Sequence, residues 1–367
     1  SLIMMEPSSQ LSAGALFCIL AVYIIWPGFF HRHSKSEEDA GWWANVCTSV
    51  AKKSMFARGS GLYDWVVIDS VSSDGDVCAR VRLCAGLQNT MHSLHGGAAA
   101  LLVDELTTVS IMSLRSHPGV TLSLSLQFVE GCYPGDVIHI TSRVLRLGKI
   151  IVHTEAEFAK ADGTVLLRST HVKYCAPPSL WLLLLWMRTS VAKLILPFLV
   201  PVSSTLNGNN LTAEERGSNA TKHPFTDSEK KAYYQQFGTP EHETIGFDSA
   251  LSPGGISAME GGRFMLANAG ALGNPNGFLH GGATAAIIDV LGSSAIANHP
   301  DASGDSCGVA TNLEVTYGAA GSHEVVFETQ VVKLGNRVAT CVVIARDRKQ
   351  RLVARGTVTK YGKFRQL

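Results

Sequence analysis

The stretch LHGGAAALLVDEL at residues 94–106 returns with few changes as LHGGATAAIIDVL at residues 279–291. Eight of the thirteen positions are identical, and both copies place an aspartate nine residues after the histidine. That aspartate stands inside an otherwise apolar run of helical length. Because burying a carboxylate costs free energy unless its charge is paired or used, an acid repeated at one offset indicates a shared role.

The similarity between the two copies continues beyond these stretches. The segment LRLGK at 145–149 matches VKLGN at 332–336, and LLRSTHVKY, ending at Tyr174, matches VARGTVTKY, ending at Tyr361. The copies are 185 residues apart at the glycine pair and 187 apart at these later segments. So small a drift indicates that one whole fold has been duplicated.

The duplication divides the chain into four regions. We predict an N-terminal region at 1–41, a first domain at 42–175, a linker at 176–224 and a second domain at 225–367. The end of the linker, residues 203–223, is rich in Asn, Ser, Thr and Gly, as flexible connections are.

Each copy has the sequence pattern of an α+β unit. A helix-like stretch comes first, at 42–53 and 226–237, and a long apolar helix follows at about 96–113 and 281–298. Segments with period-two alternation, rich in Val, Thr and Ile, come before and after each long helix and predict strands. A helix that is apolar nearly all round is expected to be wrapped by a sheet.

The glycine pair and the acid of one helix lie too far apart to serve one reacting atom. Eight residues separate Gly96 from Asp104, which is ~12 Å along a helix. Two antiparallel helices related by a twofold axis would bring the acid of each to the glycines of the other. The sequence therefore predicts two composite sites, Gly96 with Asp289 and Gly281 with Asp104. Backbone N–H groups at such a helix N-terminus can stabilise a developing oxyanion.

The composition argues against several classes of function. The formal net charge is +1, so no basic excess predicts nucleic-acid binding. The eight cysteines form no CxxC pair or zinc-ligand spacing, and the thirteen histidines form no HxxxH pattern. We therefore predict no metal site, and thiols kept reduced in their compartment.

The N-terminal region carries a candidate membrane anchor. Residues 11–30 are apolar and uncharged over about twenty positions, long enough to span a hydrocarbon core. A cleaved signal peptide would typically carry basic residues before such a run, and none is present here, so we predict an uncleaved transmembrane helix. Arg32 and Lys35 follow directly and predict that the rest of the chain lies on the cytoplasmic or matrix side.

A second apolar segment lies in the linker, at residues 179–202. Arg188 and Lys193 interrupt it and Pro197 breaks it, so neither half reaches the length of a full span. Two alternatives stay open for this segment. It lies in the membrane interface, as its tryptophans beside cations suggest, or it packs against the two domains as a linker helix.

These features resemble hotdog-fold acyl-CoA thioesterases of the phenylacetyl-CoA thioesterase type, a group that includes small mitochondria-associated thioesterase superfamily members. The resemblance rests on the HGG-x(6)-D pattern, the LG turn and the final RGT-like strand, and it covers both repeated domains. It implies two hotdog domains in tandem, each a long central helix wrapped by an antiparallel sheet. Together they would form a pseudo-twofold double hotdog behind the N-terminal transmembrane helix.

The resemblance also implies a role for individual residues. The helix acid would be the nucleophile or the general base for water, and the first glycine after the histidine would donate the oxyanion N–H. An asparagine six residues before the histidine would hold the thioester carbonyl, and a hydroxyl after a Gly-Val pair would help to place the water. The implied catalytic set is Asp104, Asp289, Asn89, Asn274, Gly96, Gly281 and Thr121.

The second copy departs from this pattern at the hydroxyl. Ala310 occupies the position that matches Thr121, with Thr311 next to it, so we expect the Asp289 site to be the weaker one. We expect the two histidines to be hydrogen-bonded loop residues rather than catalytic bases, and cations near the site mouth to meet the phosphates of coenzyme A. The predicted substrate-binding set is His95, His280, Gly97, Gly282, Lys149 and Arg337.

The implied reaction is the hydrolysis of medium-chain or long-chain acyl-CoA to a fatty acid and coenzyme A. No cofactor is implied apart from coenzyme A as part of the substrate. The expected partners are acyl-CoA, membrane lipid, and either a larger membrane complex or further copies of the double hotdog. The expected location is the mitochondrial inner membrane, with the hotdog domains on the matrix or cytoplasmic side.

Two alternatives accompany this interpretation. The first is a non-catalytic, thioesterase-like subunit of a mitochondrial membrane complex, which the two membrane-seeking segments favour and the intact acids and glycines disfavour. The second is an enoyl-CoA hydratase of the same fold. Asn274-Pro275 partly matches the hydratase motif, but the acid and histidine of that motif are missing.

Overall fold

The computed structural model describes residues 36–51, 56, 60, 62–115, 118–175, 246–275, 277–302 and 308–365. The predicted transmembrane helix, the apolar segment at 179–202, the polar linker and the helix predicted at 226–237 lie outside the described residues.

The chain contains two units that share one order of elements from the first strand of each unit onward. The first unit consists of α2 (Glu37–Ala51), α4 (Leu62–Trp65), β1 (Val66–Val71), β2 (Val77–Arg82), η3 (Ala85–Leu87), α5 (Gly96–Arg115), β3 (Val120–Phe128), β4 (Val137–Leu147), β5 (Ile151–Ala159) and β6 (Val165–Tyr174). The second unit consists of η7 (Gly246–Gly254), β7 (Ile256–Met259), β8 (Arg263–Leu266), η8 (Ala269–Leu272), α8 (Gly281–Ala297), β9 (Val309–Tyr317), β10 (Val325–Leu334), β11 (Val338–Asp347) and β12 (Leu352–Tyr361).

Helix α2 begins earlier than the sequence pattern predicts. It starts at Glu37, inside the region that we predicted to belong to the anchor, and its first turn contains Glu37, Glu38 and Asp39. Ser36 precedes the helix, and its hydroxyl accepts a hydrogen bond from the Asp39 N–H at 3.2 Å. A polar cap followed by three acids suits the positive end of the helix dipole, which is why these charged residues are helical.

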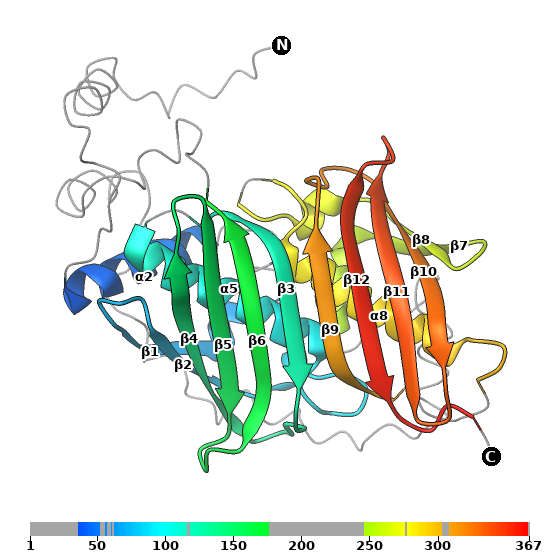
Figure 1. Cartoon of the computed structure of the whole chain (residues 1–367), viewed down its shortest axis with the longest axis horizontal. Coiled ribbons are helices and arrows are strands. Elements are labelled where there is room, and N and C mark those ends of the chain that lie inside the picture. The colour runs from blue at the N-terminus through cyan, green and yellow to red at the C-terminus, as the bar shows by residue number, and fades with distance from the viewer. Residues whose placement is uncertain are drawn as a thin grey trace.

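All strands belong to one antiparallel sheet. Its order is β1-β2-β4-β5-β6-β3-β9-β12-β11-β10-β8-β7, so β3 and β9 join the two units at the centre (Figure 1). Ser125 faces Glu314 in the middle of this junction. The two units therefore share a continuous backbone hydrogen-bond network.

The two long helices lie side by side against one face of this sheet (Figure 1). They run antiparallel and approach closely, because a Cβ atom added to Gly97 would lie 2.7 Å from the Cα of Ala286. The equivalent atom on Gly282 would lie 2.9 Å from the Cα of Leu101. The second glycine of each pair is therefore needed for helix packing, while a Cβ atom on Gly96 or Gly281 would meet the carboxylate of Asp289 or Asp104.

Helix α5 forms the centre of the first unit, and α8 that of the second. Within the described part of the chain, α5 is long and apolar enough to cross a membrane, but 94% of its apolar window is buried inside the protein. It is a core helix wrapped by a sheet. The predicted hotdog fold is confirmed in both halves of the chain, while the predicted transmembrane helix is not tested.

Candidate functional site

Two cavities of about 350 Å³ each lie where the N-terminus of one long helix meets the middle of the other. The first cavity has walls from both units, including Asp104, Thr121, Asn274 and Gly281. The second cavity also has walls from both units, including Asn89, Gly96 and Asp289. The structure thus brings together the residues of the two predicted composite sites.

The Asp104 carboxylate lies at the N-terminus of α8. Its Oδ2 atom accepts a hydrogen bond from the Gly282 N–H at 3.0 Å, across the junction of the two units. Its Oδ1 atom accepts a hydrogen bond from the Thr121 hydroxyl at 3.2 Å. The acid is 5% exposed and therefore almost fully buried, yet both of its oxygens have partners.

Lys173 supplies the counter-charge for this acid. Its Nζ atom lies 3.4 Å from Asp104 Oδ1 and donates a hydrogen bond to the Thr108 hydroxyl at 2.6 Å. Burial would raise the pKa of Asp104, but the charge of Lys173, together with His171, His280 and the Gly282 N–H, holds that pKa well below its ordinary value. Asp104 is therefore ionised at neutral pH.

His280 caps the same helix end. Its Nδ1 atom accepts a hydrogen bond from the Gly282 N–H at 3.0 Å, and its Nε2 atom lies 2.7 Å from Glu105 Oε1. Burial would lower the pKa of His280, but the hydrogen bond and charge of Glu105 raise it. Because both ring nitrogens are engaged, His280 positions the helix end, as expected for a hydrogen-bonded loop histidine.

The first residue of α8 offers a donor to the first cavity. Among the described residues, nothing accepts a hydrogen bond from the Gly281 N–H. The Tyr317 hydroxyl donates to the Gly281 carbonyl at 2.8 Å and so holds the next peptide unit, between Gly281 and Gly282. Burial, and then the charge of Asp104, raises the pKa of Tyr317, which keeps the phenol protonated. An N–H at a helix N-terminus, beside an ionised acid, can stabilise an oxyanion.

The second cavity repeats this plan with different partners. His95 accepts a hydrogen bond from the Gly97 N–H at 2.8 Å, and its Nε2 atom lies 2.8 Å from Asp248 Oδ1. Burial would lower the pKa of His95, but Asp248 raises it. Asp248 comes from η7, whereas the acid that partners His280 comes from α5. The two histidines are therefore held by residues from unrelated parts of the fold.

Asp289 has fewer partners than Asp104. Its Oδ1 atom is buried and has no hydrogen-bond partner within the described residues. Ala310 stands in register with Lys360, as Thr121 does with Lys173, so the hydroxyl of the first site is missing. Thr311 does not replace it, because its hydroxyl donates to the Thr359 carbonyl at 3.1 Å.

The two predicted asparagines line the expected cavities, but their side chains also hold their own loops. The Asn89 side-chain carbonyl accepts from the Met91 N–H at 2.8 Å, and its amide donates to the Ser93 hydroxyl at 2.9 Å. The Asn274 carbonyl accepts from the Phe278 N–H at 3.3 Å. The bond to Ser93 uses one of the two amide hydrogens of Asn89, so the other can donate to a thioester carbonyl.

The predicted phosphate-binding cations do not reach these cavities. Lys149 and Arg337 are exposed in the turns that follow β4 and β10, and neither belongs to the cavity walls that the described residues form. The Arg115 side chain, at the C-terminal end of α5, donates to the Lys149 carbonyl at 3.0 Å, so this turn lies at the opposite end of α5 from its glycine pair. The cations in the walls are Lys173 and Lys360, one in each cavity.

Sequence reasoning missed several residues of the first site. Lys173, His171, Glu105 and Tyr317 surround Asp104, yet none stands out as a motif. One signal was available for Lys173, because the final strands of both copies end in Lys-Tyr. The alternation of β6 also places His171 and Lys173 on its buried face.

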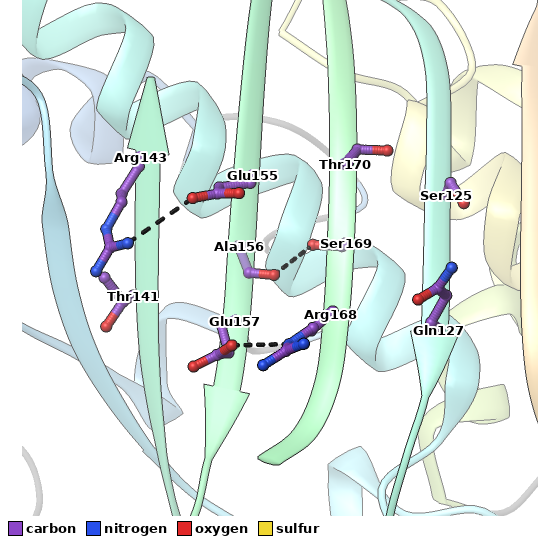
Figure 2. Close-up of a pocket in the computed structure, with 10 residues that line it drawn as sticks. All are labelled: Ser125, Gln127, Thr141, Arg143, Glu155, Ala156, Glu157, Arg168, Ser169 and Thr170. Atoms are coloured by element: carbon purple, nitrogen blue, oxygen red, sulfur yellow. Dashed lines mark hydrogen bonds and ion pairs between the residues drawn. The ribbon is translucent and has the colours of Figure 1, made fainter. Parts of the chain in front are cut away.

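A third hollow, of about 430 Å³, lies on the outer face of the sheet over β3 to β6 (Figure 2). Its charged side chains pair with one another: Arg168 with Glu157 at 3.0 Å and Arg143 with Glu155 at 3.8 Å. Within the described residues, no cluster of His, Cys, Asp and Glu could hold a metal ion, here or elsewhere. The chemistry is therefore concentrated at the two helix ends.

The chain is similar to several known thioesterases. Human acyl-coenzyme A thioesterase 13 is 29% identical over 105 residues, which cover 28% of this chain and 75% of the relative. A putative thioesterase from Novosphingobium aromaticivorans has 17% identity and a TM-score of 0.45, covering 80% of this chain and 98% of that one. A hypothetical thioesterase protein with coenzyme A from Streptococcus pneumoniae has 21% identity and a TM-score of 0.29, covering 30% of this chain and 85% of that one.

The family comparison matches each half of the chain separately. The model of the thioesterase superfamily matches residues 91–167 and again residues 276–363. Both matches contain a glycine pair, a helix acid and the strands that follow them. The two hotdog units of this chain are therefore both similar to the thioesterase superfamily.

Proposed function

We propose that the chain is an acyl-CoA thioesterase, and that the first cavity performs the hydrolysis. One observation carries this proposal. The ionised Asp104 carboxylate lies at the N-terminus of α8, beside the Gly281 N–H, in a cavity of about 350 Å³. A base and an oxyanion donor on the two sides of one cavity are what ester and thioester hydrolysis needs.

In the proposed reaction, Asp104 takes a proton from a water molecule as the water oxygen attacks the thioester carbonyl carbon. The carbonyl oxygen becomes an oxyanion, which the Gly281 N–H and the positive end of the α8 dipole stabilise. The carbon–sulfur bond then breaks, and the proton passes to the leaving thiolate. The products are a fatty acid and coenzyme A, and no cofactor is needed.

The two cavities should differ in rate. Asp289 lacks the hydroxyl partner that Thr121 supplies to Asp104, and one of its oxygens is buried without a hydrogen bond among the described residues. A carboxylate whose orientation is not fixed places water less well. We therefore expect most turnover at Asp104, with Asp289 contributing little.

The test is release of the free thiol of coenzyme A from acyl-CoAs of graded chain length, using the purified full chain. A positioned general base contributes about 10²–10⁴-fold. We expect Asp104→Asn to lose at least about 100-fold in kcat and Asp289→Asn to retain most activity.

The matched pair of variants separates the alternatives. Equal losses would mean that both cavities hydrolyse substrate, and the proposed inequality would be wrong. A folded wild-type chain that releases no thiol from any chain length would overturn the thioesterase proposal. Circular dichroism and unfolding curves on the same preparations establish that each variant is folded.

A second candidate function is acyl-CoA binding without turnover. The Asp104–Lys173 contact favours it, because an acid held ionised by a buried ammonium is a weaker base. Such a protein could be a subunit of a larger membrane complex. Tight binding of a non-hydrolysable acyl-CoA thioether, together with no thiol release from acyl-CoA, would favour this function over hydrolysis.

We also propose that the chain is anchored in a membrane, in the mitochondrial inner membrane as the leading candidate. The support is the uncharged apolar run at 11–30 and the apolar segment at 179–202. A membrane location would suit a medium or long acyl chain. Carbonate extraction of membranes from cells expressing the full chain tests anchoring, and release into the supernatant would contradict it.

A further inference from the structure

A chain of hydrogen-bonded side chains runs from Asp104 into the interior of the first unit. Thr121 Oγ1 lies 3.2 Å from Asp104 Oδ1 and 3.1 Å from His171 Nε2. The Nδ1 atom of His171 lies 2.6 Å from Thr107 Oγ1. His171 and Thr107 are completely buried. This series of hydrogen bonds therefore forms a path that begins at the acid and ends, shielded from solvent, inside α5.

The far end of this path fixes the tautomer of His171. Thr107 Oγ1 lies 2.6 Å from the Val103 carbonyl oxygen, which can only accept a hydrogen bond. The single hydroxyl proton of Thr107 therefore points to Val103, and Thr107 must accept from the other neighbour. That neighbour is His171, so Nδ1 carries the proton and Nε2 presents a lone pair to Thr121.

At the near end of the path, the Thr121 hydroxyl lies between two hydrogen-bond acceptors. Asp104 Oδ1, Thr121 Oγ1 and His171 Nε2 lie within 3.5 Å of one another. With an ionised acid and a neutral imidazole, the Thr121 hydroxyl has one proton for these two acceptors, and Lys173 Nζ also donates to Asp104 Oδ1 at 3.4 Å. Burial lowers the pKa of His171 to about 3, against the charge of Asp104, so the ring is neutral at rest. His171 Nε2 is therefore an acceptor that can receive a proton through Thr121.

The second unit provides a natural comparison, because it lacks the whole path. Register and sequence match Thr107, His171 and Thr121 to Gly292, Val358 and Ala310.

These replacements occupy the same space as the residues they match. A Cβ atom added to Gly292 would lie 3.0 Å from Val358 Cγ2, where Thr107 meets His171 in the first unit. The three polar residues are present together or absent together, although the acid and the lysine occur in both units. They therefore form one functional group that serves Asp104 alone.

We propose that His171 holds a proton for Asp104, with the Thr121 hydroxyl as the relay and Thr107 as the group that orients the ring. This inference rests on the proposed hydrolysis at the first cavity. His171 is a positioning residue, because it reaches the reacting atoms only through Thr121 and Asp104.

The proton movements balance within one turnover. As water attacks, its proton passes to Asp104 Oδ1, the Thr121 oxygen takes that proton, and the original Thr121 proton moves to His171 Nε2. When the carbon–sulfur bond breaks, the same movements run in reverse and deliver the proton to the thiolate sulfur. His171 begins and ends neutral, and Asp104 begins and ends ionised.

Two variants of His171 separate proton transfer from simple positioning. His171→Val copies the second unit, where the fold already accommodates valine. His171→Gln keeps a polar group near Nε2 but cannot take up a proton. We expect both variants to lose about 10–100-fold in kcat while KM changes less than about twofold. His153→Val, an exposed histidine on β5, is the matched control and should retain full activity.

A measurement that needs no turnover tests the tautomer directly. Long-range ¹H–¹⁵N spectra of the full chain labelled at histidine, assigned with His171→Gln, should place the His171 proton on Nδ1. A proton on Nε2, or rescue of kcat by His171→Gln, would overturn the proton-holding role. Wild-type activity that persists in both variants would overturn it too, while Asp104→Asn would still test the hydrolysis itself. A wild-type chain without thioesterase activity would remove both proposals together.

Discussion

At the scale of single residues, the decisive contact is the ion pair between Asp104 and Lys173. Both residues are 5% exposed, and their charged atoms lie 3.4 Å apart. Breaking a buried pair by removing one partner costs about 3–5 kcal/mol, because the other charge is left uncompensated. The second unit keeps the lysine, Lys360, but without an ion pair to Asp289 within 4.0 Å among the described residues.

We predict that Lys173→Met lowers the free energy of unfolding by about 3 kcal/mol and raises the pKa of Asp104. Asp104 must be ionised to act, so a higher pKa means that activity is already lost at a higher pH when the solution is acidified. The acid limb of the kcat/KM profile should therefore move to higher pH. Urea unfolding and a pH series of thiol release measure the two effects. Lys360→Met is the matched control, and equal effects of the two changes would contradict the assignment.

The sequence predicted the acids and glycines of the site but not their support. Asp104 and Gly281 follow from the repeat, because helix geometry alone forbids a site within one helix. Asp248 could not be found in this way, since η7 has no counterpart in the matched segments. His171 was visible as an inward-facing strand residue, but nothing in a strand pattern says which helical residue it will meet.

At the scale of elements, the contact between α5 and α8 positions both cavities. The second glycine of each pair lies against the backbone of the other helix, so a side chain there would push the helices apart. We predict that Gly97→Ala destabilises the chain by about 2 kcal/mol or more, although alanine is the better helix former. A Cβ atom at Gly97 would lie 2.6 Å from the Cβ of Ala286.

Gly86 supplies the control for this prediction. A Cβ atom at that position would have no neighbour within 4 Å, so Gly86→Ala should change the free energy of unfolding by less than about 0.5 kcal/mol. Urea unfolding curves on the three proteins give the comparison. A stable, fully active Gly97→Ala variant would show that the helices can separate without loss.

The strands and long helices were predictable because the spacing of apolar residues in the sequence matches the side chains that are buried in the structure. The strands that follow each long helix appear where alternation placed them, and α5 and α8 begin at the predicted glycines. The start of α2 was not predicted, because its first turn is acidic and follows a region assigned to the anchor. Capping, rather than hydrophobic pattern, determines that boundary.

At the scale of the whole molecule, two buried histidine–acid pairs connect the units. His280 of the second unit meets Glu105 of the first, and His95 of the first meets Asp248 of the second. Both histidine pKa values are raised above the ordinary value of 6.5 by these acids, against burial. A raised pKa adds stability that is fully present below pH 6.5 and is lost as pH rises through the folded-state pKa.

We therefore predict that the free energy of unfolding falls as the pH rises above about 6.5, by about 1.4 kcal/mol per unit of pKa shift. Glu105→Gln keeps an acceptor for His280 but removes the charge, so it should flatten part of this pH dependence. Urea unfolding between pH 5.5 and 8.5 measures it. Glu130→Gln, at an exposed ion pair with Lys160, should leave the slope unchanged, and an unaltered slope in Glu105→Gln would contradict the prediction.

The pairing of β3 with β9 has a consequence for how this protein can change over generations. In a symmetric pair of separate subunits, every mutation appears twice, so a loss at one site is a loss at both. Here each half has its own stretch of sequence, which can mutate separately, although both halves belong to one sheet. Gly292 and Val358 could therefore arise in one half while Thr107 and His171 remained in the other. Fusion gives the chain an asymmetry that no pair of identical subunits can inherit.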